Sequence, residues 1–214
     1  MAAKAISVRT LRRLPVYLHY LHSVESKQKN ISATAIAEFF GLNDVQVRKD
    51  LGAVSGSGRP KTGYVVSELI AQIEEHLGCK NETNTVLIGA GNLGKALLSY
   101  NGFEDFGLNI VAAFDTNPAL VGTEVNGKPI LPMVDIEAVC SNKDIHLGII
   151  TVPVAAAQEV CDCLVSYGIK AIWNFSPTIL RAPENVVVEN ENLASSLAIL
   201  SKHLNSGEEG GEEE

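Results

Sequence analysis

A glycine-rich loop between two apolar segments is the part of this chain best suited to chemistry. The run Thr85-Val86-Leu87-Ile88 leads directly into Gly89-Ala90-Gly91-Asn92-Leu93-Gly94, and a second apolar run ends at Phe114-Asp115. In this spacing the first glycine permits a tight turn and the second lets the backbone approach a pyrophosphate, while the third lets a helix pack closely on a strand. The pattern predicts a dinucleotide site with its phosphates at the start of the following helix.

The acidic residue that closes the second apolar run bears on the kind of nucleotide. Asp115 stands at the end of the strand expected after the glycine loop. A carboxylate there accepts hydrogen bonds from the hydroxyls of an adenosine ribose and repels a 2′-phosphate. The sequence therefore favours NAD+ and NADH over their phosphorylated counterparts.

Length and composition allow two modest domains. The chain has 214 residues, of which 46% are hydrophobic, enough to bury a real core. It has no apolar run of about 18 residues, and its first residues lack the apolar core of a signal peptide. We therefore expect a soluble cytoplasmic protein without a membrane partner.

The cysteines show no pattern of a redox or metal centre. Cys79, Cys140, Cys161 and Cys163 form no CxxC pair, and they have no metal-ligand spacing with the five histidines. We interpret them as reduced thiols, with a redox role for Cys161 and Cys163 as the lesser alternative, and expect no bound metal.

Charge divides the chain into a basic N-terminal part and an acidic remainder. Residues 1–64 hold ten Lys and Arg against four Asp and Glu, a net +6, and residues 65–214 hold seven against twenty-one, a net −14. A basic module on an acidic body indicates local contact with a polyanion. Residues 206–214 are mostly glycine and glutamate, and we expect them to form a disordered, solubilising tail.

Two helices are predicted at the start of the basic part. Over residues 10–24, leucines recur at intervals of three and four and form one apolar stripe, in which Pro15 is tolerable only near the helix start. A second helix begins after Ser32, whose side chain caps it, and ends at Gly41, a residue suited to a left-handed turn.

A third helix completes a helix-turn-helix. Asn43 caps it, with Gln46 three residues on completing a capping box. Val47 and Leu51 face the core, which leaves four polar residues on the exposed sides: Gln46, Arg48, Lys49 and Asp50. Of these, Arg48 and Lys49 suit phosphate or guanine contacts, and Gln46 suits adenine.

The glycine-rich, basic loop at residues 55–64 resembles the wing of a winged-helix domain. Arg59 and Lys61 would reach the flank of a DNA groove, together with the small residues Ser57 and Gly58. On pattern alone an alternative stays open, in which residues 10–64 form a plain helical subdomain with solvated charges.

A doubly wound parallel sheet is predicted for the rest of the chain. A connecting helix at residues 67–78 leads to a polar hinge at 80–84. Beyond the hinge, strands alternate with helices, as in a Rossmann-like α/β fold. The expected strands are 86–88, 109–114, 147–151, 171–174 and 186–189.

Ligands of such sheets lie at the carboxyl ends of the strands. Two strand ends carry the segments Thr151-Val152-Pro153 and Asn174-Phe175-Ser176-Pro177. Neither offers the His, Lys or Tyr that a dehydrogenase would use as proton donor. The apolar surround that they make prefers the neutral dihydronicotinamide of NADH to the charged ring of NAD+. The alternative, equally favoured by the pattern, is that Pro153 and Pro177 do no more than terminate strands and that Phe175 lies in the core.

From about Leu11 to Leu204 the chain resembles the Rex family of redox-sensing transcriptional repressors. The resemblance rests on seven segments: 42–51 with its Gln-Val-Arg-Lys-Asp-Leu core, Gly63-Tyr64, 86–94, Phe114-Asp115, 151–153, 173–175 and 188–190. It implies a homodimer that binds a palindromic operator in double-stranded DNA and that NADH releases from the DNA, while NAD+ supports or permits the bound state. It also implies that a C-terminal helix, about Asn192 to Leu204, swaps into the partner.

The chain departs from the family at three coupling positions. Some members join the cofactor and DNA domains through a tyrosine, an aspartate and an arginine, which fall here at Tyr100, Asn192 and His19. Only the tyrosine is kept, and the resemblance adds Tyr100 to the cofactor-binding set. The wing also carries Pro60 and Lys61, which depart from the commoner pattern.

The sequence thus predicts a winged-helix DNA-binding domain at 1–80 and a Rossmann domain at 81–190. A dimerisation helix at 191–205 and the tail at 206–214 complete the chain. Two function classes remain: a DNA-binding redox sensor that binds its cofactor without transforming it, and an NAD-dependent oxidoreductase or CoA-binding domain with an incidental helical extension. The basic wing and the missing catalytic acid favour the first, which is not an enzyme.

Overall fold

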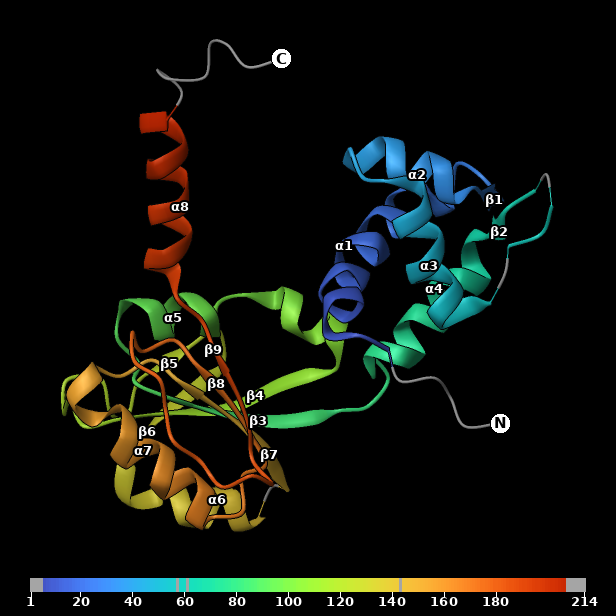
Figure 1. Ribbon diagram of the computed structural model, residues 1–214. Coiled ribbons are helices and arrows are strands. Elements are labelled where there is room, and N and C mark those ends of the chain that lie inside the picture. The colour runs from blue at the N-terminus through green and yellow to red at the C-terminus, as the bar shows by residue number, and fades with distance from the viewer. Residues whose placement is uncertain (1–5, 57, 61, 143, 207–214) are drawn as a thin grey trace. The chain divides into compact units, whose positions relative to one another are not determined.

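The computed structural model describes residues 6–56, 58–60, 62–142 and 144–206 (Figure 1). These residues form two compact units. Unit 1 runs to Glu82 and includes Glu104–Gly107, and unit 2 comprises Thr83–Phe103 and the chain from Leu108 onward. Ser57, Lys61 and the predicted tail from 207 onward lie outside the described residues.

Unit 1 has the element order of a winged helix, which confirms this part of the predicted fold. A two-residue antiparallel ladder, Asn30↔Val65 and Ile31↔Tyr64, joins its two strands. The elements are α1 (Val8–Glu25), β1 (Asn30–Ile31), α2 (Ala33–Phe40), α3 (Asp44–Ser55), β2 (Tyr64–Val65) and α4 (Val66–Leu77).

Local capping sets the helix boundaries in unit 1 as the sequence predicts. The Ser32 hydroxyl accepts from the Ala35 N–H at 3.0 Å, and Gly41 ends α2 in the left-handed region with φ 62°. Asn43 Oδ1 accepts from the Val45 N–H at 2.9 Å at the start of α3. Helix α1 begins earlier than expected, so Pro15 lies in its interior, where it removes one backbone donor.

One position on α3 contradicts the predicted pattern. Val47 and Leu51 are buried in the core as expected. Asp50, expected on an exposed side, is only 3% exposed. A side chain at that helical position points toward α1, and polar groups on α1 satisfy its charge, so burial is tolerated.

Unit 2 is a seven-stranded sheet in the order β5-β6-β4-β3-β7-β8-β9. All neighbouring pairs are parallel except β5 with β6, and the parallel strands follow the doubly wound order, with the reversal between β3 and β7. This confirms the predicted Rossmann-like sheet. The strands are β3 (Thr83–Ile88), β4 (Leu108–Asp115), β5 (Glu124–Val125), β6 (Lys128–Pro132), β7 (Ile145–Ile150), β8 (Ala171–Asn174) and β9 (Val187–Asn190).

Strands β5 and β6 are absent from the sequence prediction. Pro129 and Pro132 lie in β6, and proline normally argues against a strand because it has no N–H to donate. The segment is a strand because it pairs with β4 along Ala113↔Ile130 to Asp115↔Pro132. Tertiary pairing therefore overrides the local signal.

Helices cover both faces of the sheet. Figure 1 shows α6 (Ile136–Asn142) and α7 (Val154–Ser166) on one face and α5 (Asn92–Leu98) on the other. Two separate apolar clusters fill these layers, one including Phe114 and Leu164 and one including Leu87 and Ile149. Short 3-10 segments, η1 (Asn101–Phe106) and η2 (Met133–Asp135), precede β4 and α6.

The last described element is α8 (Leu193–Ser206). Asn192 caps it, since Asn192 Oδ1 accepts from the Ser195 N–H at 3.0 Å. Its large apolar side chains are exposed: Leu197, Ile199, Leu200 and Leu204. The predicted swap of this helix into a partner stays a prediction.

The four cysteines are free thiols, and burial raises the pKa of Cys140 and of Cys161. Within the described ranges, no helix has the length and apolar character needed to cross a membrane. The same residues include no cluster of His, Cys, Asp and Glu suited to a metal ion.

Candidate functional sites

A cavity of about 500 Å³ lies at the carboxyl ends of β3, β4, β7 and β8, beside the reversal in strand order. This is where doubly wound sheets hold their ligands. The lining is mostly apolar and consists of Ile88, Gly89, Gly91, Phe114, Asp115, Thr116, Met133, Thr151, Val152, Pro153, Ala156, Val160, Phe175, Ser176 and Pro177.

The glycine loop has the geometry that the spacing predicts. Gly89 has φ +99°, and a Cβ there would lie 2.9 Å from the Thr151 carbonyl oxygen. A Cβ at Gly94 would collide with the Gly89 carbonyl, so only glycine lets α5 approach the strand. A Cβ at Gly91 would meet no atom within 4 Å, and Gly91 itself lines the cavity. That open space fits the close approach of a phosphate group.

Asp115 fastens the glycine loop to the end of β4. Its Oδ2 accepts from the Ala90 N–H at 2.7 Å, and its Oδ1 accepts from the Asn117 N–H at 2.8 Å. A carboxylate oxygen has more than one lone pair, so each oxygen can accept a further bond. The carboxylate predicted to bind a ribose therefore also shapes the glycine loop.

Two hydroxyls hold the strand ends around the cavity. Thr151 Oγ1 donates to the carbonyls of Ile88 at 3.0 Å and Gly89 at 2.6 Å, which joins the end of β7 to the glycine loop. Ser176 Oγ donates to the Val152 carbonyl at 2.5 Å. The segments after β7 and β8 are thus tied to their neighbours without any ligand.

Asn174 holds the loop after β8, which forms part of the cavity wall. It is fully buried, and its Nδ2 donates to Thr178 O at 2.8 Å and Asn190 Oδ1 at 2.9 Å. Its Oδ1 accepts from the Ser176 N–H at 2.9 Å. Its amide is therefore occupied in holding the loop after β8, and it does not line the cavity.

Nine of the predicted cofactor-binding residues line the cavity: Gly89, Gly91, Asp115, Thr151, Val152, Pro153, Phe175, Ser176 and Pro177. The others, Ala90, Asn92, Leu93, Gly94, Asn174 and Tyr100, lie outside the lining. Tyr100 is 57% exposed, with its ring against Phe103 at 4.8 Å between centroids. Six lining residues were not among those predicted: Ile88, Phe114, Thr116, Met133, Ala156 and Val160. Thr116 directly follows the predicted strand that ends at Asp115, whereas Met133 follows β6, which the sequence did not predict.

The cavity has little capacity for acid–base chemistry. Among the described residues that line it, Asp115 is the one ionisable group, and its oxygens already accept backbone hydrogen bonds. Hydride transfer to a carbonyl requires a proton donor near the nicotinamide. The lining suits binding of a nucleotide better than its conversion.

A groove of about 470 Å³ lies on unit 1 between α3, the start of α2 and the wing. Arg48 and Arg59 both line it, beside small residues that keep it open, including Gly52, Gly56 and Gly58. Arg48 is paired with Asp44 at 2.9 Å and is 59% exposed, and Lys49 beside it is also exposed. Two guanidinium groups along one groove suit the phosphates of DNA.

The wing folds back on itself between Arg59 and Gly63. The Arg59 N–H donates to Gly63 O at 2.8 Å, and the Gly63 N–H donates to Arg59 O at 2.9 Å. Gly63 has φ +72°, and a Cβ there would collide with the Ile31 carbonyl, so β1 anchors the wing at a glycine. Tyr64 is buried against Gly58 and closes the base of the loop.

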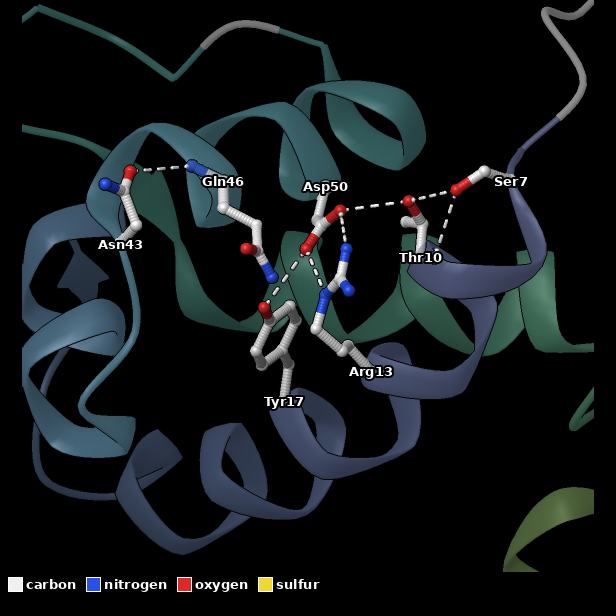
Figure 2. Close-up of polar contacts among 7 residues, drawn as sticks. All are labelled: Ser7, Thr10, Arg13, Tyr17, Asn43, Gln46 and Asp50. Atoms are coloured by element: carbon white, nitrogen blue, oxygen red, sulfur yellow. Dashed lines mark hydrogen bonds and ion pairs between the residues drawn. The ribbon is translucent and has the colours of Figure 1, made fainter. Parts of the chain in front are cut away.

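A buried polar cluster fixes α3 against α1 (Figure 2). The Arg13 guanidinium forms a bidentate pair with the Asp50 carboxylate: Nε donates to Oδ2 at 2.7 Å and Nη2 donates to Oδ1 at 2.8 Å. The hydroxyls of Thr10 and Tyr17 donate to the same carboxylate at 2.9 and 3.1 Å. Every donor comes from α1, so the cluster sets the position of the helix that carries Arg48.

The charges of this cluster shift its pKa values. Burial alone would raise the pKa of Asp50, but hydrogen bonds from Arg13 and Thr10 outweigh it and hold that pKa below its usual range. Burial, aided by the Asp50 charge, raises the pKa of Tyr17 to about 12. The carboxylate therefore stays charged and the phenol stays protonated over the physiological range.

Gln46 belongs to the same cluster. Figure 2 shows its side chain extending toward Arg13 and Tyr17 rather than back to Asn43. In the amide orientation that pairs donor with acceptor, its oxygen accepts from Arg13 Nε at 3.2 Å and Nη1 at 3.3 Å. The expected capping box is thus half formed: the Asn43 side chain accepts from backbone N–H groups of α3, but the Gln46 side chain does not return to Asn43. Arg13, which sequence reasoning missed, holds the residue predicted to read adenine.

Family models match most of unit 1 and much of unit 2. Residues 5–52 match a family model of a DNA-binding protein N-terminus, and residues 80–178 match the CoA binding domain model. A DNA-binding N-terminus followed by a CoA-binding type of sheet, together with the relatives below, places the chain in the class of ligand-responsive transcription regulators. The redox-sensing transcriptional repressor Rex of Bacteroides fragilis is 44% identical over 200 residues, 93% of this chain and 91% of its own. The chain belongs to the Rex family.

Other relatives and solved structures support this assignment. The Rex repressor of Treponema denticola is 41% identical over 95% of this chain and 97% of its own. The crystal structure of RSP with β-NAD+ and operator DNA has a TM-score of 0.89 and 38% identity, covering 96% of this chain and 95% of that one. RSP with β-NADH has a TM-score of 0.85 and 37% identity, covering 96% and 97%. The family resemblance is confirmed, and these relatives are repressors rather than oxidoreductases.

Proposed function

We propose that this protein is a DNA-binding repressor that senses the ratio of NADH to NAD+. The observation that carries the proposal is the cavity of unit 2, which has a carboxylate for a ribose and open space at Gly91, but no acid–base group besides Asp115 among its described lining residues. The matching structures of RSP with β-NAD+ and operator DNA, and with β-NADH, support the same assignment. The cavity binds the cofactor as a signal.

The walls of the cavity favour the reduced cofactor. Pro153, Phe175 and Pro177 surround the end of the cavity that faces β7 and β8. Moving the positively charged oxidised nicotinamide from water to such walls has a desolvation penalty. The neutral reduced ring has no charge to desolvate, so it binds there more favourably. A difference in affinity between the two redox forms is what lets a ligand shift the equilibrium between DNA-bound and free states.

The DNA contacts in this proposal come from α3 and the wing. Arg48, Lys49 and Arg59 bind the operator, with Gln46 and Gly58 nearby, and Ser57 and Lys61 belong to the same predicted surface. Residues 1–80 form the DNA-binding domain and 81–190 the nucleotide-binding domain. A cytoplasmic location follows from the binding of DNA and the free thiols.

A homodimer is part of the proposal. Leu197, Leu200 and Leu204 recur at helical spacing on α8 and are 62–80% exposed. Apolar side chains on one helix face are stabilised by burial in a partner, and a second copy of the chain suits an operator with two-fold symmetry. Residues 191–205 would then be the dimerisation helix.

Fluorescence anisotropy with palindromic promoter DNA tests the proposal. We expect salt-sensitive binding of the protein with NAD+ or without cofactor, and release of DNA on addition of NADH. A scrambled duplex of the same length is the control for sequence-independent binding. Absence of salt-sensitive binding, or binding that NADH leaves unchanged, would overturn the repressor assignment.

A further inference from the structure

Trp173 occupies a junction that the nucleotide site alone does not explain. It is the one tryptophan of the chain and lies on β8, on the face of the sheet opposite Ile172. Its ring contacts Phe175 at 4.7 Å and Phe103 at 5.6 Å between centroids, tilted by 53° and 76°. Its Nε1–H donates to Glu191 Oε1 at 3.2 Å. Three segments distant in sequence therefore meet at one side chain.

The first contact leads to the cofactor cavity. Phe175 lines the cavity and Trp173 does not, so Trp173 stands directly behind the wall. The backbone after Phe175 is held by Asn174 and by the bond from Ser176 to Val152. A change in the Phe175 ring when the cavity fills is therefore transmitted more readily to Trp173 than to the rigid backbone.

The second contact leads to the segment where the chain changes unit. Phe103 lies in η1 and belongs to unit 2, while the next residues, Glu104–Gly107, belong to unit 1. Within unit 1, Gly107 packs so closely on the chain after α4 that a Cβ there would lie 2.8 Å from the Cys79 carbonyl oxygen. A shift of Phe103 thus acts through the covalent chain on a segment fixed to unit 1.

The third contact leads to α8. Glu191 directly precedes Asn192, the cap of α8, and its backbone N–H donates to Asn174 O at 2.8 Å. The indole bond holds the side chain at the same point. The start of α8 is therefore tied to β8 twice, once through its backbone and once through Trp173.

We propose that Trp173 is a positioning residue that carries cofactor occupancy from Phe175 to η1 and to the start of α8. Packed aromatic rings have a few discrete arrangements, so the filling of the cavity can select one of them. The inference rests on the proposed function, because it assigns the route by which NADH alters operator binding. Removing the Trp173 ring should uncouple the cofactor cavity from the operator-binding surface, while each still binds its ligand.

The measured quantity is the coupling factor, the ratio of operator Kd with saturating NADH to operator Kd without cofactor. We expect Trp173→Leu to lower this factor by about tenfold or more, with NADH affinity within about threefold of the unmodified protein. Phe103→Leu should also lower the coupling factor, because it removes the ring that Trp173 contacts in η1. Tyr167→Leu, on the other face of the sheet, is the matched control and should leave it unchanged.

A purely structural role gives a different result. Loss of folded protein scales both operator affinities alike and leaves their ratio unaltered. Trp173→Phe keeps a ring but loses the Nε1–H, and Glu191→Gln keeps an acceptor for it, so we expect each to retain more coupling than Trp173→Leu. Should Trp173→Leu fail to fold, Phe103→Leu decides the matter.

Tryptophan emission gives a second readout in the full-length protein. It overlaps the absorption of dihydronicotinamide, so bound NADH should quench Trp173, and Phe103→Leu should change the unquenched spectrum. Coupling factors of Trp173→Leu and Phe103→Leu within twofold of the unmodified value would overturn the inference while leaving the repressor assignment intact. An unmodified protein that keeps its operator when NADH is bound would overturn the repressor assignment, and with it the inference.

Discussion

The two units each place an aspartate at a junction of elements, and the two carboxylates are used in different ways. Asp50 accepts four hydrogen bonds, all from side chains of α1. Asp115 accepts two, both from backbone amides, and lines a cavity. The comparison shows that burial and the source of the donors distinguish a structural carboxylate from one available to a ligand.

Asp50→Ala should have the largest effect. It leaves the partly buried Arg13 without its carboxylate partner and the Tyr17 hydroxyl without an acceptor, which should cost unit 1 about 3 kcal/mol of unfolding free energy. Denaturant unfolding of the full chain measures this. Asp44→Ala, which breaks the exposed pair with Arg48 on the same helix, is the control and should cost no more than about 1 kcal/mol. Equal losses in the two variants would refute the structural role of Asp50.

Asp115→Ala should act on binding rather than folding. Loss of charge-assisted bonds to ribose hydroxyls should weaken NADH by about 30-fold, with operator binding in the absence of NADH kept. Titration of NADH against both proteins checks it. Asp115→Asn keeps an acceptor for the Ala90 N–H and should lose less. Normal NADH binding by Asp115→Ala would show that Asp115, like Asp50, has only a structural role.

Arg48→Ala should weaken operator binding by about tenfold and lower the slope of its salt dependence by about one, because it removes one phosphate contact. NADH affinity should not change, since Arg48 lies on unit 1 and the nucleotide cavity on unit 2. Anisotropy at several salt concentrations gives both numbers. An unchanged salt slope would remove Arg48 from the DNA contacts.

The pH dependence should be the smallest effect. The folded pKa of Asp50 is lowered, so its contribution to stability is present above its unfolded pKa of about 3.9 and is lost as pH falls through the folded value. The folded pKa of Tyr17 is raised to about 12, so its contribution is present below about pH 10 and is lost as pH rises to about 12. A phenolate absorbance titration should show Tyr17 ionising later than an ordinary tyrosine. A lower pKa of Tyr17 in Asp50→Asn, still raised by burial, would sharpen the assignment.

Features set by neighbouring residues were predictable from the sequence. The caps at Ser32 and Asn43, the turn at Gly41 and the glycine loop depend on a few residues each, and all occur as expected. Asp50 was placed wrongly because its partner Arg13 lies 37 residues away, and no local pattern identifies that pair. Strand β6 and the lining residue Met133 were missed for the same reason, since pairing with β4 defines the strand and brings Met133 to the cavity.

The hydrogen bonds that Thr151 and Asp115 make to the glycine loop bear on how quickly the protein can respond. These bonds are made by the chain's own groups, so binding loses little entropy in ordering the loop and association can proceed at the rate of an ordinary preformed pocket. The protein would then follow changes in its ligand within the time of diffusion and exchange.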